Sequence, residues 1–136
     1  MMRKPIALKS ANAPRKPRSK AGWANVGSKK IYFRSSWELK YALYLQFLVE
    51  KKLILGWFHE PKTFWFEGIK RGCVSYLPDF KVVNNDLTHY WVEVKGYMDP
   101  KSKTKIKRFA KYFPEEKLEI VDRKWFASNK NLISRT

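Results

Sequence analysis

The sequence predicts a small α/β protein of one domain, in which a mixed β-sheet is flanked by helices. Three observations lead to this prediction. The chain has 136 residues, which suits a single domain with one modest core. Its hydrophobic content of 44% and aromatic content of 16% predict that most of it folds. Helix-like and strand-like segments follow one another in the order helix, three strands, helix, strand.

The first helix is expected from Ser35 to about Lys52. This segment is rich in apolar residues and contains neither Gly nor Pro, and Gly56 follows it as a stop signal. Glu38 lies at the N-terminal end of the face that carries the apolar side chains. These are Tyr41, Ala42, Leu45, Leu48 and Val49.

Two strands are expected next, joined by a hairpin loop. Residues 57–66 alternate between apolar and polar side chains, with an interruption at Pro61. The two glycines and three charges of residues 67–72 indicate the loop. Residues 73–83 form the second strand, and Pro78 near its middle predicts a bulge or a sheet edge.

A third strand is expected over residues 89–95, after a turn at Asn84-Asn85-Asp86. Side chains that alternate along a strand point to opposite faces of the sheet. Glu93 therefore shares a face with Trp91 and Lys95, whereas the intervening residues face the other way. We expect Trp91 to pack in the core.

The second helix should begin at Asp99-Pro100, because Asp is a good N-cap and Pro suits the first helical position. Pro114 ends it, and residues 118–121 form the fourth strand. The surface of this helix is strongly basic and without acidic residues, which favours a phosphate-binding face over an ordinary solvated one. The basic residues are Lys101, Lys103, Lys105, Lys107, Arg108 and Lys111.

Residues 1–28 are expected to form a basic, mobile arm, ahead of a single domain over residues 29–136. Ten of the 29 basic residues lie within the first 37 positions, which contain no acidic residue. Such an arm could contact phosphates; a solubilising terminus or an organellar transit peptide are the alternatives. The candidate phosphate contacts are Arg15, Lys16, Arg18 and Lys20 in the arm, and Arg34 after it.

The charge and the cysteine count narrow the classes of function. A formal net charge of +17 indicates a polyanionic partner, most simply a nucleic acid. The single cysteine, Cys73, excludes an internal disulfide framework and a metal cluster built from cysteines. No apolar run approaches the roughly 20 residues that span a bilayer. We therefore expect a soluble, cytoplasmic protein with no membrane partner.

Three acidic residues and a lysine could form a site for chemistry. Asp79 and Glu93 lie on strands that can be neighbours, Lys95 shares the face of Glu93, and Glu38 lies on the inner face of the first helix. Close carboxylates repel one another unless a cation lies between them, and Mg²⁺ or Mn²⁺ favours oxygen ligands. Each residue also has a plain structural alternative. In particular, Ser35-x-x-Glu38 fits a helix capping box.

Four stretches together resemble the PD-(D/E)XK nuclease superfamily. They also look like a small phage-encoded branch of it, similar to endonuclease I-type Holliday-junction resolvases and to transposase-subunit nucleases, which act in DNA recombination. The stretches are Arg34-Ser35-Ser36-Trp37-Glu38, Phe58-His59-Glu60-Pro61, Tyr76-Leu77-Pro78-Asp79-Phe80 and Tyr90-Trp91-Val92-Glu93-Val94-Lys95-Gly96.

The resemblance implies a restriction-endonuclease-like core and a Mg²⁺-dependent endonuclease, with Mn²⁺ as a substitute. Asp79 and Glu93 would be metal ligands, Val94 would give a carbonyl ligand, and Glu38 would be a further carboxylate of the metal shell. Lys95 would be the catalytic lysine. The chain lacks the N-terminal strand signal that a swapped dimer of the resolvase kind would need, although a homodimer is still expected for cutting two strands.

The expected function is cleavage of branched DNA in a bacterial or phage-infected cell. The alternative is a non-catalytic, basic nucleic-acid-binding protein, for which the arm and the basic helix would suffice. Acidic residues on the working face speak against this alternative, because they repel DNA. Two minor candidates lie beside the motif: Glu60, expected as an edge or loop residue, and His59, expected to be structural or solvated.

Overall fold

A four-stranded mixed sheet forms the centre of the fold, as the sequence predicts. The computed structural model describes residues 21–134, with side chains described as far as residue 132. The first three strands in the order β3-β6-β7-β8 are antiparallel, and β8 runs parallel to β7. The strands are β3 (Gly56–His59), β6 (Phe80–Val83), β7 (His89–Val94) and β8 (Leu118–Val121).

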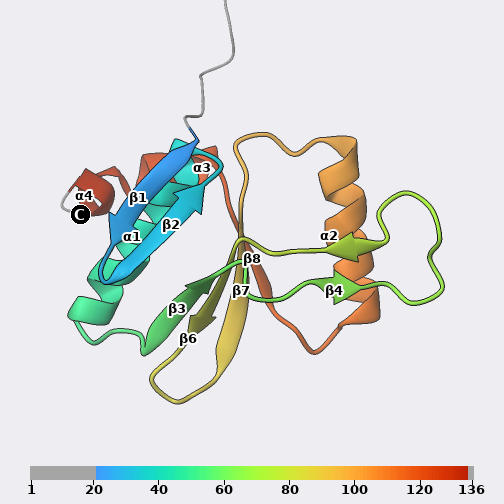
Figure 1. Cartoon of the computed structure of the whole chain (residues 1–136), viewed down its shortest axis with the longest axis horizontal. Coiled ribbons are helices and arrows are strands. Elements are labelled where there is room, and N and C mark those ends of the chain that lie inside the picture. Colours follow the sequence, from blue (N-terminus) through green and yellow to red (C-terminus); the bar gives the residue numbers. More distant parts are fainter. Residues whose placement is uncertain (1–20, 135–136) are drawn as a thin grey trace, which may run out of the picture.

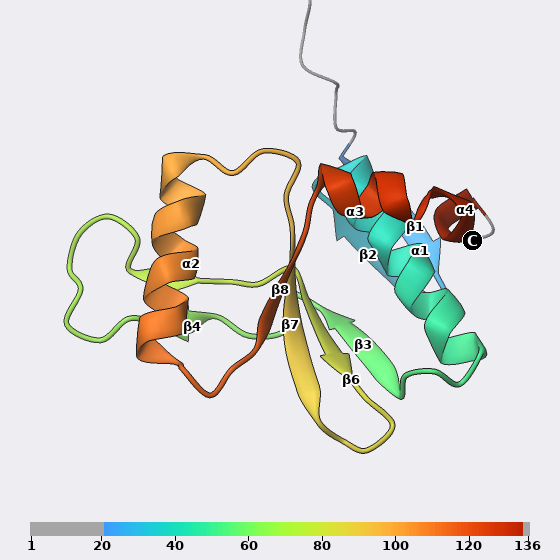
Figure 2. The same ribbon diagram turned by 180° about the vertical axis from the view of Figure 1, so that it is seen from behind.

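Helices cover both faces of this sheet (Figures 1 and 2). α1 lies on one face together with two short C-terminal helices, and α2 lies on the other. For α1, α2 and the four strands of the central sheet, the predicted order helix, three strands, helix, strand is confirmed. No helix in the described part of the chain is long and apolar enough to cross a membrane. The helices are α1 (Ser36–Glu50), α2 (Pro100–Tyr112), α3 (Arg123–Ser128) and α4 (Lys130–Ser134).

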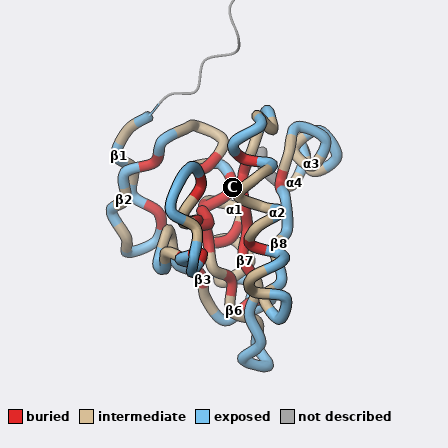
Figure 3. Tube along the Cα trace, turned by 90° about the vertical axis from the view of Figure 1, so that its right-hand side faces the viewer, coloured by how far each residue is buried: buried red, intermediate tan, exposed pale blue. Residues whose placement is uncertain are grey.

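The sheet separates two apolar clusters. Under α1, the predicted helix face meets the sheet, and the ring of Tyr41 lies 5.6 Å from that of Phe80. Under α2, Phe109 packs on Phe64, and Phe64 packs on Trp91, which is in the core as expected. Figure 3 shows the buried stretches gathered in the interior around α1 and β7.

Both long helices begin at the caps that the sequence indicates. The Ser35 hydroxyl accepts a hydrogen bond from the Glu38 amide at 3.1 Å, and the Asp99 carboxylate accepts one from the Ser102 amide at 2.7 Å. These bonds satisfy amides that the first turn of a helix leaves without partners. The caps fix where α1 and α2 start, and both starts lie beside the candidate site.

The first two predicted strands are each divided by a proline-containing break. Residues 57–66 form β3 and then β4 (Phe64–Trp65), and residues 73–83 form β5 (Ser75–Tyr76) and then β6. β4 and β5 pair in a small ladder of their own, which packs against α2. Pro78 lies in the second break and is buried, so the chain changes direction there and delivers Asp79 to the start of β6.

The structure corrects the predicted arm, because a hairpin begins at Gly22. β1 (Gly22–Val26) pairs with β2 (Lys29–Phe33), so the fold starts ahead of the predicted boundary at residue 28. The many basic residues of this segment conceal an alternation of apolar and polar side chains. The apolar side chains face inward and pack against α1. Gly27-Ser28 between two such runs is the turn signal that could have revealed the hairpin. The inward residues are Ala24, Val26, Ile31 and Phe33.

The hairpin turn depends on Gly27. Its φ of +61° lies in the left-handed region, and a Cβ atom there would come within 2.8 Å of the Gln46 side chain on α1. We expect Gly27→Ala to lower the free energy of unfolding by about 1–3 kcal/mol. Urea denaturation of the two proteins would measure this change in the free energy of unfolding. Gly72→Ala is the matched control, because Gly72 has a φ of +72° but no atom near its Cβ position. Equal losses in both variants would show that the contact with Gln46 adds nothing.

Candidate active site

Asp79 and Glu93 occupy opposite positions on two adjacent strands. Phe80 on β6 pairs with Val92 on β7, so the residue before Phe80 lies opposite the residue after Val92. The Asp79 carboxylate also accepts a hydrogen bond from the Val94 amide at 2.7 Å. Both residues are buried, with exposed fractions of 6% for Asp79 and 8% for Glu93. The antiparallel register therefore brings together two acidic residues that are 14 positions apart in the sequence.

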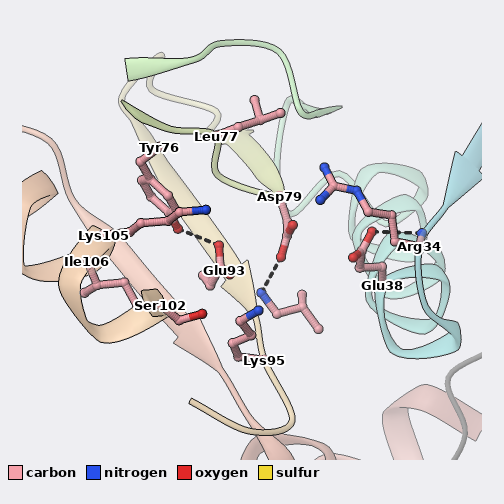
Figure 4. A pocket seen from close by; sticks show the side chains of 11 residues that line it. Arg34, Glu38, Tyr76, Leu77, Asp79, Glu93, Lys95, Ser102, Lys105 and Ile106 are labelled. Atoms are coloured by element: carbon pink, nitrogen blue, oxygen red, sulfur yellow. Dashed lines mark hydrogen bonds between the residues drawn. The ribbon is translucent and has the colours of Figure 1, made fainter. Parts of the chain in front are cut away.

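Glu38 reaches the same place from the first turn of α1. Its carboxylate accepts a weak hydrogen bond from the Arg34 amide at 3.4 Å, one residue ahead of the cap at Ser35. Glu38 thus takes part in capping and also lines the pocket with Asp79 and Glu93 (Figure 4). The two interpretations of this residue left open by the sequence do not exclude each other.

The pocket formed by these residues is about 320 Å³ in volume and is lined by both acidic and basic side chains. Lys95, which directly follows β7, and Lys105, from α2, also line the pocket, and Figure 4 shows Lys95 below Asp79 and Glu93. Five residues that the sequence singles out line this one cavity, namely Glu38, Asp79, Glu93, Val94 and Lys95. The remaining lining residues are Arg34, Tyr76, Leu77, Ser102 and Ile106.

The carboxyl groups of Asp79 and Glu93 have raised pKa values. Burial, followed by the nearby carboxylates of Glu93 and Glu38, raises the pKa of Asp79 to about 8, while the Val94 amide bond opposes the shift. Burial also raises the pKa of Glu93, against the Tyr76 hydroxyl and the Lys95 ammonium, which lower it. Strongly shifted carboxyl groups in a cavity are typical of functional sites. A cation bound among these carboxylates would offset both the cost of burying their charges and the repulsion between them.

Tyr76 also lines the pocket, although no role was predicted for it. Its buried hydroxyl donates to the Glu93 carboxylate at 2.5 Å, and burial next to that carboxylate raises the pKa of the tyrosine, which keeps it a donor. The bond fixes one oxygen of Glu93. Its position in the run Tyr76-Leu77-Pro78-Asp79-Phe80, three residues before Asp79, is the sequence signal that could have placed Tyr76 near the site.

A second polar cluster adjoins the pocket through Glu38. The His59 imidazole lies 3.5 Å from Glu38 and 3.9 Å from Glu60, and ligand atoms of all three lie within 4.8 Å of one another. Arg34 forms an ion pair with Glu60. The His59 ring is also packed at 5.0 Å from Phe33 and 5.4 Å from Phe80. His59 is therefore held by the core, as expected for a structural residue, but it contacts the site.

The basic residues of α2 divide into three groups. Lys105 lines the pocket. Arg108 instead donates to the Cys73 carbonyl at 2.7 Å and so holds the loop that precedes β5. The other four basic side chains of α2 are exposed, namely Lys101, Lys103, Lys107 and Lys111.

The predicted phosphate contacts of the arm, Arg15, Lys16, Arg18 and Lys20, lie outside the described residues.

No protein-family model matches the chain, and no curated protein or solved structure gives a significant match. An inference about function therefore rests on the chemistry of the pocket and on the charge around it.

Proposed function

We propose that the chain is a metal-dependent endodeoxyribonuclease that hydrolyses phosphodiester bonds in branched DNA, such as a Holliday junction. The observation that carries the proposal is the convergence of Asp79, Glu93 and Lys95 in one polar pocket. The order of the helices and strands supports it, because it agrees with the pattern of the PD-(D/E)XK superfamily that the sequence resembles. Glu38 at the start of α1 completes the same pattern.

The donor set suits Mg²⁺, with Mn²⁺ as a substitute. Asp79, Glu93 and Glu38 offer carboxylate oxygens, which hard divalent cations favour. The raised pKa of Asp79 reflects burial beside other carboxylates, which is the environment that a cation stabilises. Asp79 and Glu93 would hold the ion, with the Val94 carbonyl and Glu38 as further ligands. A bound ion would polarise the scissile phosphate and lower the pKa of a water molecule.

The protein's own groups have separate tasks around that position. The Val94 amide orients Asp79, and the Tyr76 hydroxyl orients Glu93, so both carboxylates are fixed before substrate binds. Lys95 brings a positive charge to the pocket, where it would stabilise negative charge that develops on the phosphate. Water would add to phosphorus and release one proton as the bridging P–O bond breaks, and the leaving oxygen would take up one proton, so that the products are a phosphate end and a hydroxyl end.

The surroundings of the pocket favour DNA as the substrate. The exposed lysines of α2 follow the proposed catalytic strand, and backbone phosphates are their natural partners. Because two strands of a junction must be cut symmetrically, we propose that two copies act as a homodimer. The compartment proposed for this activity is the cytoplasm of a bacterial or phage-infected cell.

The proposal is tested by incubating the purified chain with a labelled four-way DNA junction and with a linear duplex of matched sequence. Each DNA is treated with Mg²⁺, with Mn²⁺ and with chelator. We expect the junction to be cut in Mg²⁺ or Mn²⁺ and left intact in chelator, and the duplex to be cut much more slowly.

Equal cutting of both DNAs would support the proposed nuclease activity and contradict its selectivity for branched DNA. Tight, salt-sensitive binding without cutting in either metal would contradict the proposal. The chain would then be a non-catalytic nucleic-acid-binding protein whose carboxylates are structural.

A further inference from the structure

The outer face of the β1–β2 hairpin carries two exposed aromatic side chains next to each other. Trp23 on β1 pairs directly with Tyr32 on β2, and their ring centroids lie 5.5 Å apart. Trp23 has an exposed fraction of 66% and Tyr32 of 45%, although the inward side of the same hairpin is buried against α1. A cross-strand aromatic pair stabilises a hairpin. That role leaves most of the indole surface free.

The positive charge around the Trp23–Tyr32 pair limits the kinds of partner that could bind there. Lys30 lies on the same outer face, with its ammonium 5.8 Å from the Trp23 ring, and Arg34 follows β2. There is no acidic residue anywhere before Glu38 in the sequence. A nucleic acid would bring opposite charge to this basic face.

The pair also lies close to the pocket. Tyr32 is two residues before Arg34, which lines the pocket, and this separation spans at most about 7 Å of extended chain. The register places Gly22 opposite Phe33, so Trp23 lies at the same end of the hairpin as Arg34. Figure 1 shows this end of the hairpin beside the start of α1, from which Glu38 enters the site.

We propose that Trp23 and Tyr32 form a stacking platform for an unpaired base of branched DNA, close to the bond that the pocket acts on. The flat indole face can stack on any base, and Lys30 beside it supplies a phosphate contact. The proposal rests on the proposed nuclease function for its substrate, and it adds a way to distinguish a branch point from plain duplex. Paired bases are stacked inside the helix and cannot reach the platform.

The test measures binding in chelator, so that cutting plays no part. Fluorescence anisotropy gives the affinity for a duplex with unpaired bases at its branch and for a fully paired duplex. We expect Trp23→Ala to weaken binding to the branched DNA about tenfold and to change binding to paired duplex by less than about twofold. Trp65→Ala is the matched control, because Trp65 on β4 is equally exposed at 66% and should leave both affinities unchanged.

A second variant separates stacking from stability of the hairpin. Trp23→Leu keeps an apolar contact with Tyr32 but removes the flat ring, so it should lose the selective binding while melting near the wild-type temperature. Quenching of 2-aminopurine at the unpaired position should fall in both Trp23 variants, since it reports stacking directly.

The outcomes for the platform and for the nuclease are distinguishable. Equal loss on branched and paired DNA, or no loss on either, would overturn the platform, whatever the chain cleaves. Selective loss in a chain that cuts no DNA would support the platform and contradict the nuclease proposal.

Discussion

Glu93→Gln should lower the rate of junction cleavage in Mg²⁺ by on the order of 10³-fold or more, about 4 kcal/mol of transition-state stabilisation. Gln has nearly the same shape as Glu, and its carbonyl oxygen can still accept the Tyr76 hydrogen bond. The substitution therefore removes a negative charge from the proposed metal shell and little else. Single-turnover cleavage of the labelled junction measures the effect, and Asp79→Asn should lose a comparable factor.

Binding of DNA should survive this loss of activity. Removing an acidic group from the working face reduces repulsion of phosphates, so the affinity in chelator should stay the same or rise slightly. Glu119→Gln is the control, because it removes the same charge from an exposed position on β8 that does not line the pocket. Cleavage that persists in the Glu93 and Asp79 variants would remove these residues from the catalytic role.

Asp79 should make the metal-free protein less stable as the pH rises. Its pKa of about 8 in the fold, against about 4 in an unfolded chain, means that the folded state retains a proton which the unfolded state releases. The contribution is fully present below pH 4 and is lost between about pH 4 and pH 8, at about 1.4 kcal/mol per pH unit. Urea denaturation in chelator at pH 5 and pH 8 should show a decrease of several kcal/mol.

Asp79→Asn should flatten this pH dependence, because the amide does not titrate and can still accept the Val94 hydrogen bond. Mg²⁺ should flatten it as well in the wild-type protein, since a cation bound only by the folded state stabilises the ionised carboxylates. An identical pH profile for wild type and Asp79→Asn, both in chelator, would show that other groups already compensate the charge of Asp79.

Much of the fold could be predicted from local sequence, because caps, breaks and alternation are local signals. Ser35 and Asp99 marked the starts of the two long helices, and both act as caps. Alternation along residues 89–95 separated the apolar face from the face of Glu93. The hairpin of residues 22–33 was missed because its basic outer face outweighed the apolar alternation of its inner face in the composition.

The sequence by itself determined which residues carry acidic and basic chemistry and on which elements they lie. Only the tertiary structure decided that Glu38, Asp79, Glu93 and Lys95 line one pocket, because strand register and the position of α1 are set by packing across the whole core. It also decided what no local pattern contains: the bond from Tyr76 to Glu93 and the use of Arg108 to hold a loop. Each of these joins residues distant in the sequence, and such contacts form only when the chain has folded.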